Sequence, residues 1–173
     1  MRTHSAVPLV RACVLVLATA TLGGCGGSAP KATGASKEQL VFTSAADCAA
    51  TGMIKQPQCA QAIEAAMAQH LAGSPVYRNR PLCEAKEGPE NCERMDEKAW
   101  RPRLSAVAAS VAAAADAEAS GAQLAGTPLY PTIAGEHGFR TLGNAMMLID
   151  GDLLTFSPQA VAAAEVNASL AKN

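Results

Sequence analysis

Four cysteines within one short stretch constrain this chain more than any other feature of its sequence. They stand at positions 48, 59, 83 and 92 of 173 residues, and four cysteines allow three pairings. The local pairs, Cys48–Cys59 and Cys83–Cys92, each close a loop of about a dozen residues, which stabilises a fold by roughly 2.5–3 kcal/mol in the chain-entropy model. Crossed pairings close longer loops, so entropy leaves all three open. Each local pair flanks a turn with Gly or Pro, and this geometry favours local pairing.

Zinc binding is the other chemistry that four cysteines can support. Zinc sites use closely spaced cysteines or neighbouring histidines, and neither accompanies these cysteines. The sequence therefore predicts disulfides, with no metal ligand and no cofactor. Disulfides suit the composition, because 49% of the chain is apolar but only six residues are aromatic. Much of the apolar content is alanine, which buries little surface, so the core is expected to be thin.

The first 24 residues have the features of a bacterial lipoprotein signal peptide. Arg2 and Arg11 precede a short apolar run, Ala12–Leu22, and this run is too short to span a bilayer. It ends in Leu22-Gly-Gly-Cys25, which resembles a lipobox. An ordinary secretory signal followed by a chance cysteine is the alternative interpretation.

Lipidation would place diacylglycerol and palmitate on Cys25 and anchor the protein stably in a membrane. Gly26 is not the aspartate associated with inner-membrane retention, so the outer membrane facing the periplasm is the expected location. Residues 25–39 are small and polar, as in a flexible tether. An oxidising periplasm also permits disulfides.

The remainder of the chain divides into three regions by composition. Residues 40–102 predict a four-Cys helical region, and 103–126 form an Ala-rich spacer or helix. Residues 127–173 predict a small antiparallel β-meander with a C-terminal helix. The strongest helix pattern, over 58–71, has an apolar face that is expected to pack on the core. That face consists of Cys59, Ile63, Met67 and Leu71, together with Ala62 and Ala66.

Charge and motifs exclude several function classes. The chain has 14 basic and 15 acidic residues, and loss of the leader makes it more acidic, which argues against nucleic-acid binding. His70 is expected to end a helix and His137 to lie in a turn. No nucleophile, base and orienting group are recognisable, so no catalytic residue is predicted and the protein is not expected to be an enzyme.

Aromatic and arginine side chains are the candidates for contact with a partner. Such residues often anchor interfaces, although core packing and solvation are the alternative roles. The candidates are Tyr77, Arg78, Arg80, Trp100, Arg101 and Arg103.

The cysteine framework resembles one family of small bacterial envelope proteins. Phe42-x-Ser-Ala-Ala-Asp-Cys48, Ser74-Pro-x-Tyr77, Cys83-Glu and Trp100-x-Pro102 are similar to motifs of the YgiB family, which has a domain of unknown function. The resemblance covers about two thirds of the chain. It implies an envelope lipoprotein and no established activity.

The sequence thus predicts a disulfide-stapled α+β lipoprotein with a helical N-terminal half, an Ala-rich helical spacer and a C-terminal meander. We expect a non-enzymatic module that binds or scaffolds an envelope protein or cell-wall component. The alternative is a small periplasmic ligand- or metal-binding protein that uses the meander.

Overall fold

Six short strands form the central sheet. The computed structural model describes residues 38–151 and 153–172, so the predicted signal peptide, Cys25 and the predicted tether up to residue 37 lie outside it. All neighbouring strands are antiparallel except β1 and β8, which run parallel. In order across the sheet, the strands are β7 (Met146–Leu148), β6 (Gly138–Arg140), β5 (Thr127–Pro131), β4 (Ala106–Ser110), β1 (Gln39–Phe42) and β8 (Leu154–Phe156).

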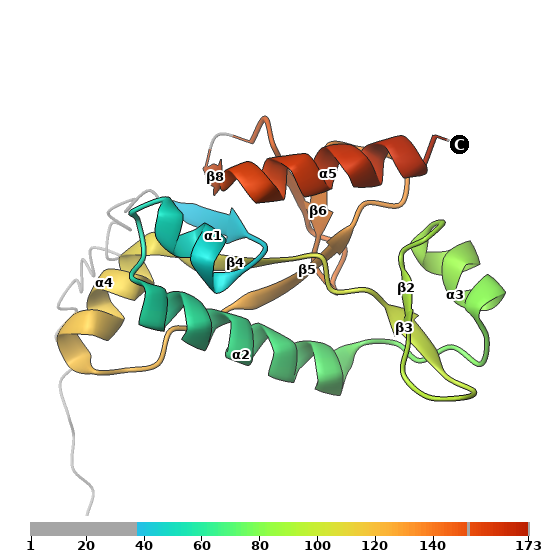
Figure 1. The fold of residues 1–173 in the computed structure, drawn as a ribbon, viewed down its shortest axis with the longest axis horizontal. Helices are drawn as coiled ribbons and strands as arrows, with labels where there is room; N and C mark the ends of the chain where they lie inside the picture. Colours follow the sequence, from blue (N-terminus) through green and yellow to red (C-terminus); the bar gives the residue numbers. More distant parts are fainter. Residues whose placement is uncertain (1–37, 152, 173) are drawn as a thin grey trace, which may run out of the picture. The chain divides into compact units, whose positions relative to one another are not determined.

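Helices cover both faces of this sheet (Figure 1). The helices α1 (Ala45–Ala50) and α2 (Gln56–Gly73) pack on one face, and α5 (Pro158–Leu170) packs on the other. The helix α4 (Val111–Ser120) continues directly from β4. A two-stranded hairpin, β2 (Cys92–Arg94) and β3 (Trp100–Pro102), lies beside α3 (Arg80–Glu87). The described residues therefore form a three-layer α/β/α arrangement with one small appended subregion.

Alternation along the central strands divides the core in two. Leu40 and Phe42 of β1 join the cluster beneath α1 and α2, whereas Val41 joins the cluster beneath α5. The residues of β4 alternate in the same way. Successive side chains of a strand point to opposite faces, so two buried central strands can support helices on both sides.

The Ala-rich region is not the helical spacer that the sequence predicted. Its first part is β4, a buried strand paired with β1 on one side and β5 on the other, and only Val111–Ser120 is helical. Alanine favours a helix in isolation. Here tertiary packing overrides that preference, because small side chains on both faces allow helices to approach the sheet centre closely.

The contact at Gly126 shows how closely α2 approaches the sheet. A Cβ atom at Gly126, just before β5, would lie 1.9 Å from the carbonyl oxygen of Ala62 in α2. Any side chain at this position would push the helix away from the strand. Gly126 and the alanines of α2 thus replace bulky core residues with close backbone contact.

The helix α2 buries part of the predicted face. Cys59, Ala62 and Ala66 are buried as predicted and His70 is buried with them, whereas Met67 and Leu71 are 39% and 56% exposed. The small and the large apolar residues both recur at helical spacing, so periodicity does not distinguish them. The disulfide of Cys59 and the close approach at Ala62 turn the small-residue face inward.

Both disulfides join cysteines that are neighbours along the chain. Cys48–Cys59 connects α1 to the start of α2 with a Cα–Cα distance of 5.9 Å, and both cysteines lie in the core beneath these helices. Cys83–Cys92 connects α3 to β2 across 6.2 Å. One bond therefore belongs to the main core and the other holds the appended subregion together.

The predicted α+β class with two disulfides is confirmed, but the predicted arrangement differs in its details. Strands β5, β6 and β7 form an antiparallel meander, yet they continue the sheet that contains β1 and β4. The last strand, β8, leaves the meander and pairs with β1 at the far edge. None of the helices within 38–151 and 153–172 is long and apolar enough to cross a membrane.

Candidate functional site

The last turn of α2 carries a histidine that is completely buried. His70 has no exposed surface, and its Nδ1 lies 2.8 Å from the Ser74 hydroxyl and 3.0 Å from the Tyr130 hydroxyl. These two hydroxyls are themselves 3.2 Å apart. Ser74 is the C-cap residue of α2 and Tyr130 belongs to β5, so the contact ties the helix end to the sheet. Burial raises the pKa of the Tyr130 hydroxyl, which keeps it protonated and able to donate.

The other imidazole nitrogen faces the β2–β3 hairpin. Nε2 of His70 lies 3.1 Å from Oε1 of Glu93, and the same oxygen accepts a 2.6 Å hydrogen bond from Nε of Arg101. Glu93 and Arg101 are directly opposite each other in the hairpin. A neutral imidazole that donates to this carboxylate leaves Nδ1 to accept from a hydroxyl. We call these five residues, Tyr130, Ser74, His70, Glu93 and Arg101, the His70 cluster.

A pocket of about 380 Å³ opens beside the His70 cluster. Its polar lining residues are Thr43, His70, Glu93, Arg101 and Ser105. Its apolar lining residues are Ile63, Met67, Leu104, Ala106 and Val107. Pockets that bind small groups are commonly apolar with a few convergent polar atoms. We call this cavity the His70 pocket.

Two of the larger apolar residues that the sequence assigned to the core face of α2 line the His70 pocket. Ile63 packs against the main core and also lines the pocket. Met67 is 39% exposed and lines the pocket. The prediction therefore holds for Ile63, whereas Met67 lies at the pocket.

A second buried polar cluster joins α3 to the meander. Arg140 of β6 forms an ion pair with Glu87, and both side chains are less than 10% exposed. Its other nitrogens donate to the Pro131 carbonyl at 3.1 Å and to Oδ1 of Asn144 at 3.2 Å. The Tyr77 hydroxyl donates to the other oxygen of Glu87. We call Tyr77, Glu87, Arg140 and Asn144 the Arg140 cluster; every nitrogen of its guanidinium has a partner.

The pKa of Tyr77 is raised by its burial beside Glu87. Burial, the hydrogen bond to Glu87 and the charge of Glu87 raise the pKa of Tyr77 from 10.0 to about 12. Each of these causes disfavours a phenolate. The Arg140 cluster also lines a pocket of about 310 Å³ together with Pro75 and Lys86.

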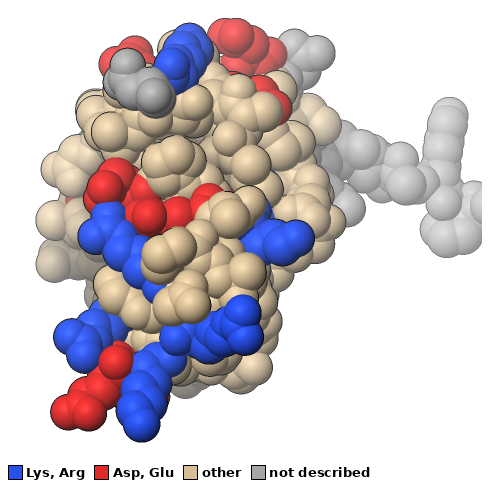
Figure 2. Space-filling model, turned by 90° about the vertical axis from the view of Figure 1, so that its right-hand side faces the viewer, with Lys and Arg blue, Asp and Glu red and all other residues tan. Residues whose placement is uncertain are grey.

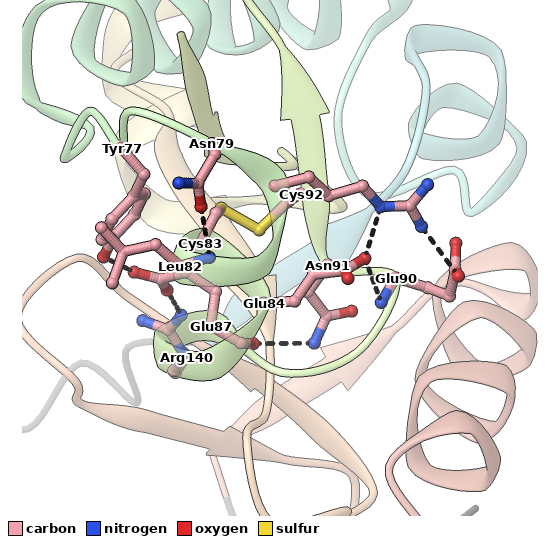
Figure 3. Close-up of a disulfide and its surroundings, with 11 residues drawn as sticks. Tyr77, Asn79, Leu82, Cys83, Glu84, Glu87, Glu90, Asn91, Cys92 and Arg140 are labelled. Carbon is pink, nitrogen blue, oxygen red and sulfur yellow. Dashed lines mark hydrogen bonds and ion pairs between the residues drawn. A yellow bond between two sulfur atoms is a disulfide. The ribbon is translucent and has the colours of Figure 1, made fainter.

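The Cys83–Cys92 disulfide holds α3 against the hairpin (Figure 3). Near it, Nε of Arg80 donates to Glu84 at 2.8 Å, and the same arginine pairs with Glu90 at 2.8 Å. The Asn91 amide donates to the backbone oxygen of Glu87 at 2.9 Å. These bonds hold the polypeptide that presents Glu93 and Arg101, although they lie outside the His70 pocket.

The six predicted contact residues do not form one flat patch. Tyr77 pairs with Trp100 through the backbone, and Arg80 stacks over the Trp100 ring at 5.8 Å. Arg101 turns inward to Glu93, which leaves Arg78 and Arg103 as the exposed arginines of the set. On the face that bears α3 and the hairpin, basic and acidic side chains are interspersed (Figure 2). Arg101 and Arg103 each line a pocket.

Sequence reasoning missed the partners of His70. The sequence predicted His70 only as a helix end and assigned no role to Glu93. The available signal was the spacing of Cys59, Ala62, Ala66 and His70, which places the histidine on a stripe of small residues that a close helix contact would bury. Glu93 gave no comparable signal, because its role depends on the hairpin.

The His70 cluster contains the residue types of a hydrolytic triad, and Ser74 and Glu93 each lie within hydrogen-bond distance of the His70 ring. Ser74 follows the C-terminus of α2, where helix carbonyls carry partial negative charge, and its own N–H donates to the His70 carbonyl at 3.1 Å. A tetrahedral oxyanion requires converging N–H donors instead. Among residues 38–151 and 153–172, no group of three or more His, Cys, Asp or Glu could hold a metal ion.

These features define a class: a small disulfide-bonded α+β domain with an amphipathic pocket between a helix and the sheet. The chain belongs to the DUF1190 family of proteins of unknown function, whose family model matches residues 36–149. The match includes both disulfides and every residue that lines the His70 pocket. Comparison with curated proteins and with solved structures finds no match.

Proposed function

We propose that this protein is a lipid-anchored binding module of the bacterial cell envelope, similar to YgiB, and that it is not an enzyme. The lipobox-like Leu22-Gly-Gly-Cys25 supports the anchor. The two disulfides support an oxidising compartment, because such bonds persist outside the cytoplasm. The acylated Cys25 would hold the domain at the periplasmic face of the outer membrane.

The single observation that supports binding is the mixed lining of the His70 pocket. His70, Glu93 and Arg101, which contact one another, line it together with five apolar residues. The polar groups are held by bonds to one another, so they need little reorganisation when a ligand enters. A projecting group from an envelope partner, with an apolar body and a polar end, fits this pattern.

The meander provides weaker support for the alternative, a small ligand- or metal-binding site. Its pocket contains Arg140, but the nitrogens of this arginine already bond to Glu87, Asn144 and the Pro131 carbonyl. A ligand there would have to break a buried ion pair, which is unfavourable. The His70 pocket requires no such exchange.

Site-specific photocrosslinking in the native envelope tests the binding proposal. A photoreactive residue at Met67 faces the His70 pocket, whereas one at Leu71 lies four residues further along α2 and outside it. We expect a discrete crosslinked product from position 67 that is absent from position 71 and weakened by Arg101→Gln. Identical products from both positions, or none from position 67, would contradict binding in this pocket.

Intact-mass analysis of protein purified from native cells tests the proposed lipidation and the disulfides separately. We expect acyl chains on residue 25 and two disulfides, with the acyl mass absent from Cys25→Ser. An unmodified Cys25 in the native protein would remove the membrane anchor from the proposal and leave the pocket unaffected.

A further inference from the structure

A second pocket lies beside α5 and combines apolar side chains with polar groups that can donate hydrogen bonds. It has a volume of about 500 Å³ and lies between α5 and the segment that leads from β3 into β4. Leu104, Ala163 and Val166 contribute apolar surface, and Arg103, Gln159 and Asn167 contribute polar groups. No Asp or Glu lines it. We call it the α5 pocket.

Asn167 brings an unpaired side-chain amide to the α5 pocket. Its side chain is 5% exposed, yet its amide nitrogen has no hydrogen-bond partner among the residues that the structure describes. Buried amides are almost always paired, because an unpaired donor loses its water without compensation. An acceptor placed in the α5 pocket would satisfy it after a small rotation of the amide.

Two further donors point to the same chemistry. Arg103 is exposed, and within the described part of the chain its guanidinium forms no ion pair, in contrast to Arg101 two residues earlier. The Gln159 side-chain oxygen lies 3.2 Å from the Thr43 hydroxyl, which also donates to Asp47, and the Gln159 NH₂ group carries two N–H donors. The pocket therefore offers three groups of donors and no carboxylate.

We propose that the α5 pocket binds a small organic carboxylate with an apolar body. The carboxylate interacts with Arg103 and the Asn167 and Gln159 amides, since charge-assisted bonds to guanidinium are strong. The apolar body lies along Leu104, Ala163 and Val166. This site adjoins the His70 pocket, because Thr43, Leu104 and Ser105 line both. Its polar groups, Arg103, Gln159 and Asn167, line only the α5 pocket, and its ligand need not be the partner proposed for the His70 pocket.

Titrating the folded domain with octanoate, followed by amide NMR shifts, tests the proposal. We expect saturable shifts at residues 103, 159 and 167. Acetate lacks the apolar body and octanol lacks the charge, so both should bind at least about tenfold more weakly, as expected for loss of about 1.4 kcal/mol. Octanol binding as tightly as octanoate, or shifts confined to residues outside the α5 pocket, would overturn the proposal.

Matched variants identify the arginine. Arg103→Gln should weaken octanoate binding about tenfold or more, and Arg78→Gln, which removes the same charge from an exposed position outside the pocket, should leave it unchanged. Ala162→Phe fills the rim of the α5 pocket from an exposed helix position and should also block octanoate. Equal affinities for Arg103→Gln and Arg78→Gln would contradict the assigned site.

Two controls separate this proposal from others. Met67→Lys should leave octanoate binding unchanged, so failure of the α5 pocket and failure of the His70 pocket are distinguishable. Phosphatidylglycerol vesicles test a membrane surface as the source of the negative charge. Binding of vesicles without binding of octanoate would overturn the proposal of a small-molecule site.

Discussion

The His70 cluster and the Arg140 cluster use similar residue types in opposite ways. Each contains an arginine, a glutamate and a tyrosine, and each joins the hairpin subregion to the central sheet. In the Arg140 cluster both charges are buried and the guanidinium is fully occupied by protein groups. In the His70 cluster Glu93 remains 33% exposed and borders a pocket with apolar lining residues.

The difference separates a structural clamp from a binding surface. A buried ion pair whose bonds are complete holds two elements together, and its disruption leaves an uncompensated charge. A polar cluster that reaches a cavity retains surface for a ligand. Residue types alone do not distinguish the Arg140 cluster from the His70 cluster. The folded structure decides how many hydrogen-bonding groups in each cluster already have protein partners.

Breaking the clamp should have the largest effect. Arg140→Met leaves Glu87 buried without its cation, so the free energy of unfolding should fall by about 3–5 kcal/mol. Arg101→Met should cost less, because Glu93 is partly solvated and keeps its contact with His70. Lys55→Met removes an exposed pair with Glu118 and should change stability by less than about 1 kcal/mol. Urea denaturation measures all three, and equal losses for Arg140→Met and Arg101→Met would contradict the distinction.

Two neighbouring residues of α2 test which helix face supports structure and which lines the pocket. Ala66→Gln inserts a polar side chain into the main core and should destabilise the domain by about 1–3 kcal/mol or more. Met67→Gln lies on the pocket side and should change the free energy of unfolding by no more than about 0.5 kcal/mol. A larger loss from Met67→Gln than from Ala66→Gln would contradict this assignment.

The smallest effect concerns the two tyrosines, one in each cluster. Tyr77 has a pKa of about 12 in the folded protein against 10.0 for the free side chain, and burial also raises the pKa of Tyr130. A raised acid pKa means that the folded state holds the proton more tightly, so this contribution to stability is complete below pH 10 and declines as pH rises toward about 12.

Tyrosinate absorbance measures that titration directly. Both tyrosines should ionise above pH 10 in the folded protein and near pH 10 in urea. Glu87→Gln removes a negative charge beside Tyr77 and should lower its pKa while leaving Tyr130 nearly unchanged; Tyr77→Phe identifies the signal. A tyrosine that ionises at its ordinary pKa in folded wild-type protein and is lost in Tyr77→Phe would contradict the buried contact with Glu87.

Several helix starts depend only on nearby residues. Ser44 and Asn79 accept hydrogen bonds from backbone N–H groups at the starts of α1 and α3, a role for which short polar side chains are preferred. The C-terminal helix begins at Pro158 behind a Ser157 cap. Such signals act within one turn of helix, so no distant part of the chain can change them.

Longer-range features were predicted poorly. The Ala-rich segment has a helical composition, yet Ala106–Ser110 forms a buried strand because β1 and β5 supply hydrogen-bonding partners on both sides. The candidate contacts Tyr77 and Arg101 turned inward because Glu87 and Glu93, distant in sequence, lie beside them in the fold. Neither pocket could be predicted, since each combines residues from several elements.

The sequence by itself determined the cysteine framework, the helix caps and the apolar stripes, because each depends on residue type and short spacing. Only the tertiary structure decided which stripe of α2 is buried, which arginine is fully paired and where pockets remain. The physical reason is that a helix with two apolar faces can pack on either of them. The disulfide at Cys59 and the contact between Gly126 and Ala62 select one.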